Sequence, residues 1–124
     1  VMKYYIRRHC GNIITFANQS GVPVFCCGEA MEELIPGTTD AAVEKHVPVI
    51  TQEGNTVTVC VGSAPHPMLE EHFIEWISLE TREGYQHKEL NPGEEPKAVF
   101  ALSEEDSVVA AYAYCNLHGL WKSE

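Results

Sequence analysis

Apolar and polar residues alternate along much of the chain beyond residue 46, and this alternation is its main structural signal. Over residues 56–61, Val57, Val59 and Val61 are separated by threonine and cysteine. A period of two is typical of a strand with one buried face. Similar patterns predict strands over 47–51, 56–61, 72–81, 85–90, 98–102 and 108–114, although the alanines of the last segment would also suit a helix.

Glycine, asparagine and proline mark the turns between these segments, at 53–55, 83–84 and 91–93. Residues 39–43 could form one helical turn with a threonine or aspartate cap. Roughly seven short strands at this spacing are typical of a sandwich. The predicted fold class is therefore all-β, an immunoglobulin-like antiparallel β-sandwich.

The first 36 residues differ from the rest of the chain. They carry cysteines at 10, 26 and 27 and end at Pro36. Two brief apolar stretches, 13–16 and 22–25, predict a small hairpin. A piece of this size is normally supported by a metal or by a partner chain. The sequence thus predicts a small N-terminal unit over 1–36 and a larger domain over 37–124.

Composition excludes several classes of function. The 124 residues are 44 % hydrophobic and 21 % charged, which suits a chain with a real core, and the net charge is −10. Such a charge is repelled by nucleic acid and by anionic membranes. No apolar run is long enough to cross a bilayer, and no secretory signal is evident, so we expect a cytoplasmic protein. Five cysteines, an odd number, favour free thiols or metal binding over a disulfide framework.

Four histidines and one cysteine lie in loops or at the ends of predicted strands. They are His46, His66, His72, Cys115 and His118. Any one of them alone would more often be a surface or core residue, and Cys-x-x-His is a weak motif by itself. Five in one small domain suggest a transition-metal site, because nitrogen and sulfur donors select such metals. We assign Cys60 and His87 to packing and surface, and Trp76 and Trp121 to the core.

Three other interpretations fit parts of this pattern. A cupredoxin-like electron carrier would use two histidines, one cysteine and a weak methionine ligand, for which Met68 is a loose fit. A structural zinc site is closed and four-coordinate, which leaves one of the five candidates unexplained. A non-catalytic interaction domain would need none of them.

Three segments, 44–49, 66–72 and 115–121, resemble the superoxide reductases of the desulfoferrodoxin and neelaredoxin family. The resemblance extends to the N-terminus, where Cys10-Gly11-Asn12 and Cys26-Cys27-Gly28 are similar to the family's desulforedoxin-like unit. It implies an immunoglobulin-like fold and one mononuclear iron per chain, which cycles between Fe(II) and Fe(III). The implied reaction is the one-electron reduction of superoxide to hydrogen peroxide.

The resemblance also implies a role for individual residues. His46, His66, His72 and His118 match the four equatorial iron ligands, and Cys115 matches the axial thiolate. Lys45 matches the lysine that draws in superoxide and assists protonation, and Glu44 matches the carboxylate that closes the sixth position after oxidation. The expected partners are superoxide, an external electron donor such as rubredoxin, and further copies of the chain in a homodimer or higher homo-oligomer.

The N-terminal unit departs from the family's pattern at one position. The desulforedoxin-like site pairs a Cys-x-x-Cys motif with a vicinal Cys-Cys pair, but here Arg7 stands where the first cysteine would be. A guanidinium cannot replace a thiolate. We therefore expect the N-terminal unit to lack its own iron and to serve as a scaffold.

Overall fold

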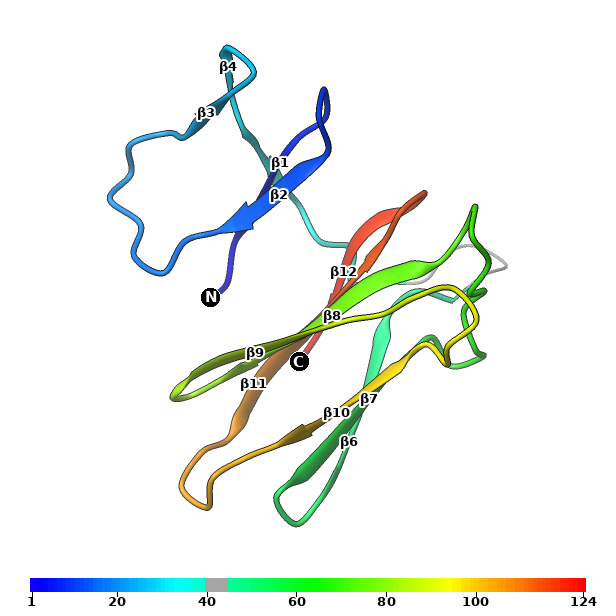
Figure 1. Cartoon of the computed structure of the whole chain (residues 1–124). Helices are drawn as coiled ribbons and strands as arrows, with labels where there is room; N and C mark the ends of the chain where they lie inside the picture. Colours follow the sequence, from blue (N-terminus) through cyan, green and yellow to red (C-terminus); the bar gives the residue numbers. More distant parts are fainter. Residues whose placement is uncertain (40–44) are drawn as a thin grey trace. The chain divides into compact units, whose positions relative to one another are not determined.

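The computed structural model describes residues 1–39 and 45–124. They divide into two compact units, Val1–Ile35 and Pro36–Glu124, and neither contains a helix within the described residues (Figure 1). The helical turn expected over 39–43 lies, apart from Thr39, outside the described residues. No helix in the described part of the chain is long and apolar enough to cross a membrane.

The first unit contains five short strands: β1 (Tyr4–Arg7), β2 (Asn12–Thr15), β3 (Phe25–Cys26), β4 (Glu29–Ala30) and β5 (Glu32–Leu34). β1 is the central strand of a sheet ordered β2-β1-β5, whereas β3 and β4 pair with each other. The predicted hairpin between 13–16 and 22–25 is wrong, because Ile13 and Ile14 pair with β1. The alternation of β1 explains this choice, since Tyr4 and Ile6 are its buried positions.

The second unit contains seven strands within the described residues: β6 (Pro48–Glu53), β7 (Thr56–Val61), β8 (Ile74–Thr81), β9 (Gly84–Glu89), β10 (Lys97–Ala101), β11 (Val108–Cys115) and β12 (Gly119–Ser123). They form two antiparallel sheets, ordered β10-β7-β6 and β12-β11-β8-β9 (Figure 1). The prediction of an all-β, immunoglobulin-like sandwich is confirmed.

The core lies between the two sheets. One sheet contributes the valines of β7 and Phe100, and the other contributes Ile77, Leu79 and the small residues of β11, all of them buried. Ala111 and Ala113 are fully enclosed. The alanines of β11 therefore serve a strand that needs small side chains at a crowded position, not a helix.

Two of the differences from the predicted strands concern β8 and β12. β8 begins at Ile74 instead of residue 72, because His72 forms an isolated antiparallel bridge with Leu69 before the strand starts. β12 was not predicted, and it completes one sheet by pairing with β11 from Ala111 to Cys115. Both differences fall beside candidate ligands, so they shape the site.

Candidate metal centre

The register of the two sheets brings the candidate ligands to one end of the sandwich. Pro48 pairs with Val61, so the loops that carry His46 and His66 leave adjacent strands at the same end. Cys115 pairs with both Ile74 and Gly119, which brings the starts of β8 and β12 beside it. His72 and His118 each lie just before one of those two strands. Segments far apart in the sequence thus meet there.

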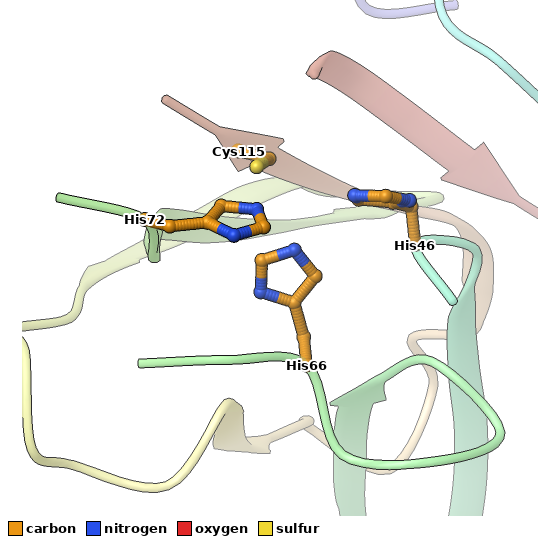
Figure 2. Close-up of side chains that lie close together, drawn as sticks. All are labelled: His46, His66, His72 and Cys115. Atoms are coloured by element: carbon orange, nitrogen blue, oxygen red, sulfur yellow. The ribbon is translucent and has the colours of Figure 1, made fainter. Parts of the chain in front are cut away.

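Four of the predicted ligands surround a common space (Figure 2). One ligand atom from each of His46, His66, His72 and Cys115 lies within 4.8 Å of the others. The ring centroids of His46 and His66, and those of His66 and His72, are 4.8 Å apart. A single ion with bonds of about 2.1 Å spans about 4.2 Å between opposite ligands, close to this spread.

His118 joins the same cluster from the turn between β11 and β12. Its Nδ1 lies 3.1 Å from His46 Nε2 and 3.8 Å from Cys115 Sγ. Its ring centroid is 5.1 Å from that of His72. His118 therefore presents Nδ1 to the cluster, and its side chain is more exposed than those of the others.

The orientation of His66 is set by its own neighbour. Nδ1 of His66 lies 2.7 Å from the carbonyl oxygen of Pro67. A carbonyl only accepts, so Nδ1 carries the proton and donates it. Nε2 is then left as the lone-pair nitrogen, and a hydrogen bond of this kind commonly fixes a metal-binding imidazole.

The donor set fits a transition metal. The exposed fractions are 2 % for His46, 3 % for His66 and 0 % for Cys115, so most of the site is shielded from water. The donors are imidazole nitrogen and thiol sulfur, which hard cations such as Ca²⁺ and Mg²⁺ do not prefer. The structure brings all five predicted residues together, and their role as ligands stays a prediction.

Asn116, which the sequence did not single out, connects the two ligand-bearing segments. Its side-chain oxygen accepts a hydrogen bond from the Phe73 backbone N–H at 3.0 Å, and its side-chain nitrogen donates to the Glu71 carbonyl at 3.1 Å. Its own backbone N–H donates to the Phe73 carbonyl. Asn116 thus ties the turn of Cys115 and His118 to the chain around His72.

Replacing Asn116 with alanine should loosen this connection. The partly buried Phe73 N–H would lose its acceptor. A fully buried donor left unsatisfied costs about 1–3 kcal/mol, so we expect a loss of about 1 kcal/mol here. We expect Asn116→Ala to lower the free energy of unfolding by that amount and to weaken metal retention, measured by denaturant titration and competition with a chelator. Asn116→Asp keeps the acceptor oxygen, so its unfolding free energy and metal retention should lie between those of the parent chain and those of Asn116→Ala. An alanine variant with unchanged retention would show that Asn116 does not hold the site.

Trp121 contacts the site, so its assignment to the core is wrong. The half-buried indole stacks on the His46 ring at 4.8 Å between centroids and 16° between planes. Its Nε1 donates to the His118 carbonyl at 3.1 Å. Gly37 makes room for it, because a Cβ there would lie 2.7 Å from two ring atoms of Trp121.

The other named residues are placed as follows. Met68 packs against the core, where its sulfur accepts a hydrogen bond from the Ile74 N–H at 3.4 Å. His87 bonds to Ser78 at 2.6 Å, and burial lowers its pKa. Cys60 is half-buried on β7. Lys45 is half-buried beside His46, and Glu44 lies outside the described residues.

Comparisons with known proteins agree with this geometry. A desulfoferrodoxin family model matches residues 38–124. A desulfoferrodoxin of Nitratidesulfovibrio vulgaris is 50 % identical over 117 residues, covering 94 % of this chain and 90 % of that one. A desulfoferrodoxin homolog of Archaeoglobus fulgidus is 47 % identical over 123 residues, covering 99 % and 97 %. The crystal structure of the superoxide reductase from Treponema pallidum superposes with a TM-score of 0.88 at 37 % identity, covering 100 % of this chain and 98 % of that one.

Proposed function

Because the chain belongs to the desulfoferrodoxin family, we propose that it is a superoxide reductase whose single mononuclear iron is held by His46, His66, His72, His118 and Cys115. The observation that supports this most directly is the gathering of four imidazoles and one thiol at one end of the sandwich. Each chain spans nearly the whole of the other in the match to the Treponema pallidum enzyme.

The reaction consumes one electron and two protons: O2•− + e− + 2 H+ → H2O2. A bound iron supplies a centre that changes its oxidation state by one electron. Cys115 would bind it as a thiolate, because a coordinating thiol is deprotonated. The four imidazoles would bind in their neutral form, so the loaded site carries a net positive charge that favours an anionic substrate. Trp121 covers His46 and limits the freedom of that ring.

Lys45 is proposed to attract superoxide and to assist its protonation, and Glu44 would serve as an additional carboxylate ligand of the oxidised iron. An acidic chain of net charge −10 would repel an anion at long range. Screening limits such repulsion to about 8–10 Å at physiological salt, so the local field decides the encounter. One ammonium next to a positively charged site can therefore outweigh distant carboxylates.

Replacing Lys45 with alanine tests this role. We expect Lys45→Ala to slow the association of superoxide and to flatten its dependence on ionic strength, both measured by stopped-flow or pulse radiolysis of the reduced protein. Lys88→Ala, on β9, removes the same charge elsewhere in the unit and should leave the rate nearly unchanged. Equal rates for Lys45→Ala and the parent chain would disprove the steering role.

Metal analysis separates the proposed enzyme from a copper carrier or a structural zinc protein. We expect close to one iron per chain, colourless when reduced and blue when oxidised. An intense blue copper band would contradict the assignment. Expression in iron-rich medium matters, because the same ligands also bind zinc. Two irons per chain, one with a rubredoxin-like spectrum, would contradict the metal-free N-terminal unit.

The proposed function extends to the electron donor, the assembly and the location of the chain. We propose that an external one-electron carrier of the rubredoxin type reduces the site directly, since only three cysteines are present in the first unit. We further propose a homodimer or higher homo-oligomer in the cytoplasm. A donor assay with reduced rubredoxin and sedimentation of the purified chain test the first two.

A further inference from the structure

Three thiols meet in the first unit, whereas the proposed iron ligands all belong to the second unit. Cys10 lies in the turn after β1, Cys26 is the last residue of β3, and Cys27 lies in the turn between β3 and β4. Their sulfur atoms are all within 4.8 Å of one another. Cys10 Sγ is 3.6 Å from Cys26 Sγ, and Cys26 Sγ is 3.9 Å from Cys27 Sγ. Cys10 and Cys27 are exposed and Cys26 is half-buried, so small oxidants can reach the cluster.

The fourth position of the family's four-thiolate pattern does not fit a metal in this chain. Arg7 occupies it, and its Nε donates to the Cys26 carbonyl at 2.9 Å while its Nη2 lies 3.6 Å from Glu29. The guanidinium is therefore held by β3 and β4 through partners other than sulfur. The three thiols therefore lack the fourth ligand of a four-thiolate metal site, and we consider their redox chemistry instead.

The three thiols are not equivalent. The backbone N–H of Asn12 hydrogen-bonds to the Cys10 sulfur, which lowers the pKa of that thiol. Donation of the Cys27 thiol toward Cys10 raises the pKa of Cys27 to about 11. The Cys10 thiol therefore ionises more readily than the Cys27 thiol, which stays protonated at neutral pH. A thiolate, not a thiol, is the form that attacks an oxidant.

Cys26 is better placed than Cys27 to pair with Cys10. It has the short sulfur–sulfur distance of 3.6 Å, and Asn12 Nδ2 also lies 3.6 Å from its sulfur. Cys27 has a left-handed backbone with φ of 54°, an unusual conformation for a residue other than glycine. The Cys26 and Cys27 sulfurs are 3.9 Å apart, farther than those of Cys10 and Cys26.

We propose that Cys10 and Cys26 form a thiol–disulfide couple that consumes hydrogen peroxide, the product of the superoxide reduction proposed above. The inference rests on that proposed function for its source of oxidant. In the first step the Cys10 thiolate attacks peroxide, an S–O bond forms, the O–O bond breaks, and hydroxide leaves and is protonated to water. Cys10 is oxidised by two electrons to a sulfenic acid.

In the second step Cys26 attacks the Cys10 sulfur. An S–S bond forms, the S–O bond breaks, and water leaves with the thiol proton. The sum is H2O2 + 2 RSH → RSSR + 2 H2O, in which peroxide is reduced and the two thiols are oxidised. An external dithiol would return two electrons by thiol–disulfide exchange. The first unit would thus remove the peroxide that the second unit makes.

The test adds hydrogen peroxide directly to the reduced, iron-loaded full-length chain, so it does not depend on superoxide turnover. Remaining thiols are then alkylated and the peptides are analysed by mass spectrometry. We expect two of the five cysteines to become resistant to alkylation and a linked peptide pair joining Cys10 to Cys26. The loss should be at least about tenfold slower in Cys10→Ser, because the thiolate is missing.

Variants resolve the order of events. Cys26→Ser should stop at the sulfenic acid, which dimedone traps on Cys10. Cys27→Ser should still form the Cys10–Cys26 bond, and Cys60→Ser on β7 serves as the matched control. A Cys10–Cys26 pair that stays reduced, a Cys26–Cys27 bond, or a metal that protects all three thiols until a chelator is added would each overturn the inference. Repeating the test with superoxide shows whether the second unit supplies the peroxide; a linked pair with added peroxide but not with superoxide would refute only the proposed function.

Discussion

Replacing Cys115 with serine should abolish superoxide reduction while leaving the fold in place. Serine has nearly the same shape, and residue 115 is fully enclosed, so the core should be little disturbed. Among the described residues, Cys115 supplies the only sulfur in the second unit's ligand group. A serine hydroxyl is not deprotonated as a bound thiol is, so the donor changes in kind. Loss of a residue that only hydrogen-bonds to a metal ligand already lowers metal affinity or activity about 10–100-fold. For loss of the ligand itself, we expect the rate of superoxide reduction to fall by more than about 100-fold.

Two readouts separate this effect from simple unfolding. Activity is measured per bound iron, and the visible band of the oxidised protein is recorded alongside the unfolding transition. Cys60 lies on β7, in the other sheet of the same unit. Cys60→Ser is the matched control and should retain both the visible band and the activity. A Cys115→Ser chain with the band and the rate of its parent would show that the sulfur is not a ligand.

Gly62→Ala should be the most destabilising single-methyl change in the second unit. Gly62 follows β7 with φ of +83°, and a Cβ there would lie 2.5 Å from the Ala64 carbonyl oxygen and 2.6 Å from that of Lys45. Its N–H donates to the Val47 carbonyl, so the loop cannot simply move away from the segment that carries His46. A left-handed non-glycine residue alone costs about 1–3 kcal/mol, and displacement of the two carbonyls adds to that.

Gly54→Ala isolates the close approach from the backbone conformation. Gly54 has φ of +61° in the turn between β6 and β7, and a Cβ there meets no atom within 4 Å. We expect Gly62→Ala to lose at least about 2 kcal/mol more unfolding free energy than Gly54→Ala, with weaker iron retention only in Gly62→Ala. Equal losses in the two variants, measured by urea denaturation, would show that the approach of Lys45 and Ala64 to Gly62 does not support the site.

Most strands of the second unit could be predicted from the alternation of apolar and polar residues. β7 spans the predicted residues because Val57, Val59 and Val61 leave one register possible. β12 was missed because its five residues lie beside the Cys-x-x-His motif and only Leu120 is buried. The N-terminal hairpin was mispaired because two short apolar segments do not reveal their partner, which the buried positions of β1 decide.

The candidate site was predictable as residues but not as an arrangement. The motifs named the five donors, yet His46 and His118 are 72 positions apart and only the sheet register brings them together. Asn116 accepts its hydrogen bond from a residue 43 positions away. The stacking of Trp121 on His46 likewise depends on β12 and on Gly37. These supporting contacts join distant segments, so no local pattern marks them.

Superoxide reduction by this chain is tested most directly by mixing the ferrous protein anaerobically with superoxide in a stopped-flow instrument. The absorbance of the centre, peroxide and oxygen are followed together. We expect one-electron oxidation of each iron and no release of oxygen. In the Cys10→Ser chain, which lacks the peroxide-consuming thiol proposed above, we expect one hydrogen peroxide per superoxide consumed. Oxygen released in step with peroxide would indicate dismutation, and an unreactive ferrous centre would indicate another function. Either result would contradict the proposed superoxide reductase activity.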